Sequence, residues 1–259
     1  MSFSIKANGH TYEADLLVFD KDGLMFEAQQ FWIELADSRL RALCKHCSVE
    51  QQHAWAKLMG VSVKTSESGK VESTYVEPTG ILAIAPPTEE IVILAAFLVD
   101  HCGMVWHAAR TLAKDIFEIS DADFRLERAI KAQPGYEALM KRINDLGIPY
   151  GVATSDTVER TRDSMKLYNC WDNVRFVVTS ADVALGKPHP DMLLYISKLE
   201  NLPTDRMVMI GDSYVDVAMA KAAGSIGLGV TIFDDMKEKM KPYATEILDS
   251  LEEIELNKL

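Results

Sequence analysis

The second half of the chain repeats one pattern: a short apolar run rich in Val and Ile, then polar or small residues, then a segment of helical periodicity. Three of these runs end in hydrogen-bonding residues, and they are Ile148–Ala153, Arg175–Val178 and Met207–Ile210. Near the start, Leu16–Phe19 lacks alternation, as expected of a strand covered on both faces, and Asp20 follows it. Strands that alternate with helices predict an α/β fold with a doubly wound, Rossmann-like parallel sheet.

A stretch of helical character, from about Glu27 to Ala132, separates the first strand of this pattern from the later ones. We expect helices at Phe31–Leu43, at Glu50–Met59 and at Glu89–Phe117, the last with Thr88 as its N-cap. Between them, Val61–Val63 and Val71–Val76 flank Ser68-Gly69-Lys70 and indicate a small hairpin or a long loop. The stretch therefore reads as an inserted, mostly helical domain.

Two domains follow from this pattern. The core would comprise residues 1–26 and 133–259, and the inserted domain residues 27–132. Gln133-Pro134-Gly135 is expected to form a hinge where the insertion rejoins the core. Asn8-Gly9 lies between β-compatible segments, so an N-terminal hairpin is expected at about residues 3–14.

The composition restricts the kinds of partner. A net charge of −12 argues against nucleic acid or an anionic membrane as the main partner, because both attract Lys and Arg clusters. The most apolar run, Ile91–Val99, is shorter than the roughly 18 residues of a membrane span, and the N-terminus does not resemble a signal peptide. Four cysteines in a chain of this length predict free thiols. We expect a cytoplasmic protein that acts on a small molecule, either as a monomer or as a dimer.

Acidic and cationic residues stand at the ends of the predicted strands. Asp20 and Asp22 are costly to crowd together unless a cation or a proton offsets their repulsion, and Asp212 would supply a further oxygen ligand. Thr154 and Lys187 offer a hydroxyl and an ammonium to charged phosphoryl oxygens. Because strand ends converge at one edge of a parallel sheet, these residues predict a Mg²⁺-dependent phosphoryl site.

The same residues form four ordered motifs that resemble those of the haloacid dehalogenase-like hydrolases. The motifs are Phe19-Asp20-Lys21-Asp22-Gly23, Thr154, Gly186-Lys187-Pro188-His189-Pro190-Asp191, and Gly211-Asp212-Ser213-Tyr214-Val215-Asp216. The resemblance spans the whole core, and a second aspartate at position 22 is similar to the phosphatases and mutases of the group. Leu24 and Glu27 depart from the residues usual after the first motif, so the resemblance says little about the hinge and the substrate.

The resemblance implies a role for each of these residues. Asp20 would be the nucleophile that forms a phospho-aspartate, and Asp22 the general acid and base that also lends its backbone carbonyl to Mg²⁺. Thr154, Ser155 and Lys187 would bind the substrate phosphate. Asp20, Asp22, Asp212 and Asp216 would form the metal site, although Asp216 could instead be an exposed residue in the first turn of a helix. The inserted domain would be the helical cap that closes over the substrate.

The leading hypothesis is a phosphomonoester hydrolase acting on a small phosphorylated metabolite. A phosphomutase of the beta-phosphoglucomutase type is the alternative among enzymes. A receiver-like signalling module that accepts a phosphoryl group is the alternative from another class, and the proposed acid/base at Asp22 and the insertion count against it.

Cys44-Lys45-His46-Cys47, with His53 downstream, has metal-ligand spacing. A lone C-x-x-C without a second pair is a weak signal, so two thiols on a helix are the simpler interpretation. Phe97 and Trp106 are expected in the core of the helical domain.

Overall fold

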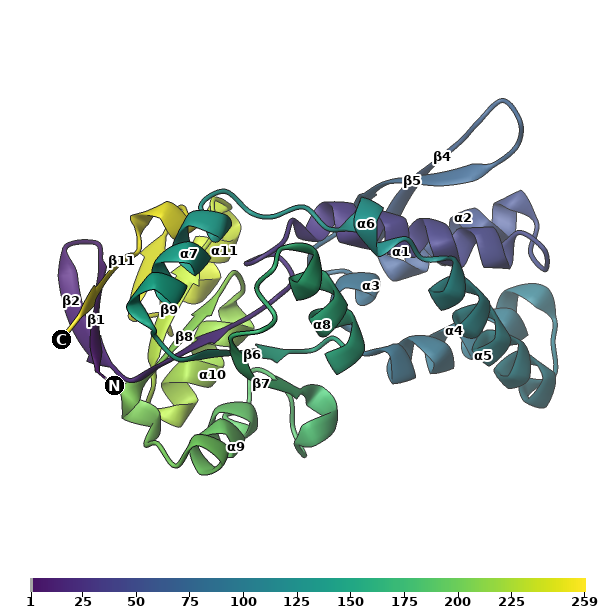
Figure 1. Ribbon diagram of the computed structural model, residues 1–259. Helices are drawn as coiled ribbons and strands as arrows, with labels where there is room; N and C mark the ends of the chain where they lie inside the picture. The colour runs from purple at the N-terminus through teal and green to yellow at the C-terminus, as the bar shows by residue number, and fades with distance from the viewer. Residues whose placement is uncertain (1) are drawn as a thin grey trace. The chain divides into compact units, whose positions relative to one another are not determined.

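The computed structural model describes residues 2–259, and these divide into two compact units. The first combines the chain up to Glu27 with Ala132–Leu259, and the second is Ala28–Lys131 (Figure 1). We call them the core unit and the inserted unit. Among the described residues, no helix has the length and apolar character needed to cross a bilayer.

The core unit contains a six-stranded parallel sheet with the strand order β10-β9-β8-β3-β6-β7. The strands are β3 (Leu16–Phe19), β6 (Tyr150–Thr154), β7 (Val174–Thr179), β8 (Met207–Gly211), β9 (Ile226–Val230) and β10 (Glu246–Leu248). The chain leaves β3 in one direction toward β6 and β7 and later crosses to β8 on the other side, so the strand order reverses at β3. This confirms the predicted α/β fold, and because ligands of such sheets bind where the strand order reverses, we expect a ligand site at the carboxyl end of β3.

Helices connect these strands. They are α7 (Tyr136–Leu146), α8 (Val158–Leu167), α9 (Asp191–Glu200), α10 (Tyr214–Ala223) and α11 (Asp234–Met240). Met192 and Ile196 of α9 and Met219 of α10 are buried in one hydrophobic cluster with Leu16 and Val18 of β3. β3 is buried along its whole length, which explains why its sequence does not alternate.

A separate antiparallel sheet of the core unit has the order β11-β1-β2. Its strands are β1 (Phe3–Ala7), β2 (His10–Ala14) and β11 (Glu255–Lys258). Asn8 and Gly9 both have positive φ, 49° and 82°, as a two-residue hairpin turn requires, so the predicted N-terminal hairpin is confirmed. The pairing of β1 with β11 had no signal in the sequence.

The inserted unit is mostly helical. Its elements are α1 (Ala28–Leu43), α2 (Val49–Met59), β4 (Val61–Thr65), β5 (Val71–Val76), α3 (Ile81–Ile84), α4 (Pro87–Cys102), α5 (Trp106–Asp123) and α6 (Leu126–Ala129). β4 and β5 pair as an antiparallel hairpin, so the predicted hairpin, and not the alternative long loop, is present. The turn of this hairpin projects from the helices of the inserted unit (Figure 1).

Three expectations for the inserted unit were wrong. The helix expected at Glu89–Phe117 is two helices, because Gly103 adopts φ = 68° and ends α4. Pro86, rather than Thr88, occupies the N-cap of α4, so the helix starts two residues earlier with Pro87 at its first position. Trp106 is 49% exposed at the start of α5, whereas Phe97 is buried as expected.

Gln133 lies where the chain returns to the core unit. Its backbone N–H donates to the Met25 carbonyl (3.0 Å) and its side-chain amide donates to the Gly23 carbonyl (2.8 Å). Next to it, the backbone N–H of Ala132 donates to the Tyr168 hydroxyl (2.9 Å). The outgoing and returning segments are therefore tied to each other within the core unit.

Candidate active site

Three of the predicted site residues lie at the carboxyl ends of three neighbouring strands, at one edge of the core sheet. Asp20 follows β3, Asp212 follows β8 and Thr154 is the last residue of β6. β3 pairs with β6 on one side and with β8 on the other, and all three strands run parallel. Residues that are far apart in sequence therefore emerge beside one another, as the strand-end argument predicted.

Lys187 connects two of the carboxylates. Its Nζ lies 2.6 Å from Asp20 Oδ1 and 2.6 Å from Asp216 Oδ1, and the Lys187 side chain is only 4% exposed. Burial lowers the pKa of this ammonium, but Asp20 and Asp216 raise the pKa by more, so it stays above its ordinary value. Lys187 is thus held as a cation against the proposed nucleophile.

Asp20, Asp212 and Asp216 form the one group of metal-ligating side chains found among the described residues, with ligand oxygens all within 4.8 Å of one another. Burial raises the pKa of Asp20 and, more strongly, that of Asp212, and the neighbouring carboxylates raise both further. Crowded carboxylates at a buried strand edge suit a hard cation with oxygen ligands, so the donor set fits Mg²⁺.

Asp216 is buried, which is the opposite of an exposed position in the first helical turn. It lies in the first turn of α10, where Oδ2 accepts the backbone N–H of Ser213 (3.1 Å) while Oδ1 accepts from Lys187. The residue thus caps the helix and holds Lys187 at the same time.

Asp22 lies outside the group of three carboxylates. Its Oδ1 accepts from Lys21 Nζ at 2.7 Å, and Lys21 also contacts Asp156 Oδ2 at 2.8 Å. Lys21 is fully buried between the two acids. Burial raises the pKa of Asp22 to about 6, although the Lys21 charge opposes this shift. At neutral pH a carboxyl group with this pKa can both give and accept a proton.

Lys21 and Asp156 were not among the predicted site residues. A lysine between two aspartates has the sequence character of a solvated turn, so its burial could not be inferred. Asp156 follows Thr154 and Ser155, and a polar strand end that continues for three residues was the only signal that pointed to it.

Thr154 and Ser155 differ in their surroundings. Thr154 is buried, and its hydroxyl accepts the backbone N–H of Asp156 (3.1 Å). Ser155 is exposed, and its carbonyl accepts the Ser180 hydroxyl (3.5 Å). Thr154 is not a helix cap, because Thr157 caps α8.

Gly23 approaches Asp212 more closely than any other residue type could. It has φ = +94°, and a Cβ at this position would lie 2.0 Å from Asp212 Oδ2. We expect Gly23→Ala to displace the Asp212 carboxylate and to weaken Mg²⁺ binding by at least about 10-fold, by analogy with the loss of a ligand-orienting contact. Isothermal titration with Mg²⁺ measures this change.

The control for this prediction is Gly69→Ala in the β4–β5 turn, where φ is also positive but a Cβ meets no atom within 4 Å. It should leave Mg²⁺ affinity unchanged. Equal affinities for Gly23→Ala and the unaltered protein would show that Asp212 does not depend on this close approach.

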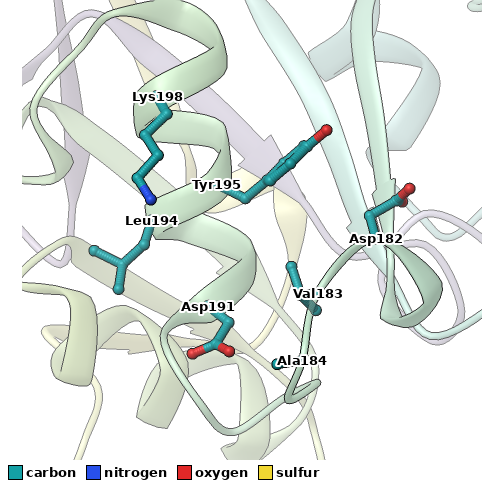
Figure 2. A pocket seen from close by; sticks show the side chains of 7 residues that line it. All are labelled: Asp182, Val183, Ala184, Asp191, Leu194, Tyr195 and Lys198. Carbon is teal, nitrogen blue, oxygen red and sulfur yellow. The ribbon is translucent and has the colours of Figure 1, made fainter.

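The core unit also has a concave region that none of these carboxylates lines. It has a volume of about 310 Å³ and lies between residues 182–184 and α9 (Figure 2). Its lining residues are Asp182, Val183, Ala184, Asp191, Leu194, Tyr195 and Lys198. None of the predicted catalytic residues belongs to it.

Comparisons with known proteins identify the family and the fold. A family model described as haloacid dehalogenase-like hydrolase matches residues 14–224. The chain is 31% identical over 125 residues to a phosphoglycolate phosphatase of Neisseria meningitidis, covering 47% of this chain and 53% of that protein. It is 30% identical over 131 residues to a bifunctional riboflavin kinase/FMN phosphatase of Arabidopsis thaliana, covering 50% of this chain and 34% of that one. The matched segments thus span about a third to a half of the length of these relatives.

Solved structures show the same fold. A protein described as a predicted phosphoglycolate phosphatase from Haemophilus somnus matches with a TM-score of 0.66 and 15% identity, over 92% of this chain and 95% of that one. A predicted phosphatase from Clostridium acetobutylicum matches with a TM-score of 0.58 and 22% identity, over 93% and 95% of the two chains.

Proposed function

Since the chain belongs to the haloacid dehalogenase-like hydrolases, we propose that it is a Mg²⁺-dependent phosphatase that hydrolyses a small phosphorylated metabolite through a phospho-aspartate at Asp20. The observation that carries the proposal is the contact of Lys187 with Asp20 beside Asp212 and Asp216. A buried carboxylate with a fixed cation and a divalent-ion site at its side is equipped to attack a phosphoryl group.

Asp20, Asp212 and Asp216, with the backbone carbonyl of Asp22, would hold Mg²⁺, which neutralises charge on the phosphoryl oxygens when bound. Lys187 would neutralise further charge and orient Asp20 through the same contact that it makes in the structure. Thr154 and Ser155 would supply hydrogen bonds to the remaining phosphoryl oxygens.

The reaction would proceed in two steps. A carboxylate oxygen of Asp20 bonds to phosphorus, the bond from phosphorus to the ester oxygen breaks, and Asp22 gives this oxygen its proton. Asp22 then takes a proton from water, the resulting hydroxide attacks phosphorus, and Asp20 is released with inorganic phosphate. The pKa of Asp22, raised by burial to about 6, suits this exchange of roles.

The inserted unit would be the cap of the family and would determine which ester is accepted. The first experiment is a phosphate-release screen of the full chain over phosphoglycolate, sugar phosphates and nucleotides, with Mg²⁺ and with a chelator. Release that requires Mg²⁺ supports the proposal. Formation of an isomerised phosphate ester without free phosphate would show that the protein is a phosphomutase and not a hydrolase. A phospho-aspartate that lasts for minutes, without turnover of any ester, would favour the receiver-like module.

The buried carboxylates also predict how Mg²⁺ affects stability. A carboxyl whose pKa is higher in the folded than in the unfolded protein binds more protons when folded, so metal-free stability falls as the pH rises toward the folded pKa. Asp20 and Asp212 are shifted in this direction. Mg²⁺ replaces these protons, so its stabilising effect should grow with pH and reach about 2.7 kcal/mol at one hundred times its Kd.

Thermal melting from about pH 4, the ordinary pKa of an aspartate, up to pH 8, with and without Mg²⁺, tests this prediction. Asp212→Asn removes one of the shifted carboxyl groups and should flatten the pH dependence of the Mg²⁺ effect. A Mg²⁺ effect that is constant over this pH range would contradict the assignment of these carboxylates to the metal site.

A further inference from the structure

Two cysteines of the inserted unit lie side by side although they are 55 positions apart in the sequence. The Sγ atoms of Cys47 and Cys102 lie 3.7 Å apart. Cys47 is buried and Cys102 is half-buried, so one sulfur of the pair is closed to solvent and the other is partly open to it. The C-x-x-C spacing suggested a relation between Cys44 and Cys47, but in the structure the thiol of Cys47 contacts that of Cys102.

The backbones that carry the two thiols are fixed against each other. Cys47 directly precedes Ser48, the N-cap of α2, and Cys102 is the last residue of α4. The Gln51 side chain donates to the carbonyl of His101 (2.7 Å), and the Gln52 side chain donates to the carbonyl of Cys47 (3.0 Å). A disulfide requires the 3.7 Å between the two sulfurs to shorten to about 2.05 Å, and these contacts hold the segments that carry them close together.

The other two cysteines are differently placed. Cys44 lies beyond the end of α1, not on a helix as expected, and its exposed thiol donates to the Arg41 carbonyl (3.1 Å). Cys170 is buried in the core unit, and its thiol donates to the Tyr168 carbonyl (3.1 Å). Over residues 2–259, the cysteines and histidines form no group of three or more potential metal ligands.

We propose that Cys47 and Cys102 form a reversible intramolecular disulfide that locks the start of α2 to the end of α4. The bond is a modification site within the inserted unit and does not depend on the phosphatase reaction. In a reducing compartment such a pair stays as two thiols until a small-molecule disulfide accumulates.

The exposure of the two sulfurs sets the order of the chemistry. Burial and, to a smaller extent, the contact with Cys102 raise the pKa of Cys47 to about 12, so Cys47 stays a thiol beside the more accessible Cys102. The Cys102 thiolate attacks a low-molecular-weight disulfide, forms a mixed disulfide and releases one small thiolate. The Cys47 sulfur then attacks the Cys102 sulfur, its proton goes to the departing second small thiol, and the protein disulfide is complete.

Over these two reaction steps, two protein thiols are oxidised and one small disulfide is reduced to two thiols. The new bond closes a loop from residue 47 to residue 102 and reduces the conformational freedom of the unfolded chain. We expect the oxidised protein to melt about 5–10 °C above the reduced protein.

The test uses the full chain equilibrated with mixtures of reduced and oxidised glutathione. Free thiols are then alkylated, and a protease digest is analysed by mass spectrometry. We expect a peptide that links Cys47 to Cys102, the loss of two alkylatable thiols, the rise in melting temperature, and reversal of all three by dithiothreitol. Cys44→Ser, a matched substitution at a neighbouring exposed thiol, should behave as the unaltered protein does.

Cys102→Ser and Cys47→Ser should both lose the linked peptide and the rise in melting temperature. Because Cys102 is only half-buried, its variant keeps the test valid if Cys47→Ser folds poorly. Glutathione that remains on Cys102 of the unaltered protein, a link between Cys44 and Cys47, or four alkylatable thiols at every glutathione ratio would each overturn the proposal.

Discussion

Asp20→Asn should lower phosphatase turnover by roughly 10⁴-fold or more, because an amide oxygen is a far weaker nucleophile than a carboxylate. The fold should survive, since the side chains have nearly the same shape and Lys187 keeps its contact with Asp216. The measurements are the rate of phosphate release with the best ester of the screen and the melting temperature of the same sample.

Asp172→Asn is the matched control, because Asp172 is an exposed residue of the core unit and lies outside the site. It should retain full turnover. A second check is the covalent intermediate: rapid acid quenching should trap an acyl phosphate on the unaltered chain and none on Asp20→Asn. An Asp20→Asn protein that turns over at the normal rate would remove Asp20 as the nucleophile.

Lys187→Met should affect both activity and stability. The substitution leaves Asp20 and Asp216 buried without the ammonium that now lies 2.6 Å from each. Removing one partner of a buried ion pair costs about 3–5 kcal/mol in the free energy of unfolding, so denaturant melts should show a loss of this size. Turnover should fall with it, because Lys187 would no longer orient Asp20 or neutralise the phosphoryl oxygens.

The control for this prediction is Lys198→Met on α9, which removes an exposed ammonium and should change stability by less than about 0.5 kcal/mol. Combining Lys187→Met with Asp216→Asn should recover part of the lost stability, since one unpaired charge is then gone. If the double variant is less stable than Lys187→Met, the ion pair does not account for the loss.

Much of the candidate site could be predicted because its residues stand at strand ends. β3, β6 and β8 are uninterrupted apolar runs, and parallel strands bring their carboxyl ends to one edge whatever the distance in sequence. This argument alone predicts that Asp20, Thr154 and Asp212 lie close together.

Lys21 shows where such reasoning stops. Its ammonium is buried because two carboxylates, Asp22 and Asp156, surround it from different strand ends. Whether a charged side chain is buried depends on where its ion-pair partners lie in space, and the periodicity of apolar residues in the sequence does not give these positions. For the same reason the pairing of Cys47 with Cys102 was not predicted, since it depends on how α2 and α4 pack.

The position of β3 in the sheet has a consequence for how the protein is assembled during synthesis. Leu17 pairs with Tyr150 on one side and with Val208 on the other. The inserted unit leaves the ribosome before either partner exists, and because it is a compact unit by itself we expect it to fold first. The strand that bears Asp20 meanwhile stays an unpaired apolar segment that other chains or chaperones can bind. The candidate site is thus completed only when β8 is synthesised, late in translation.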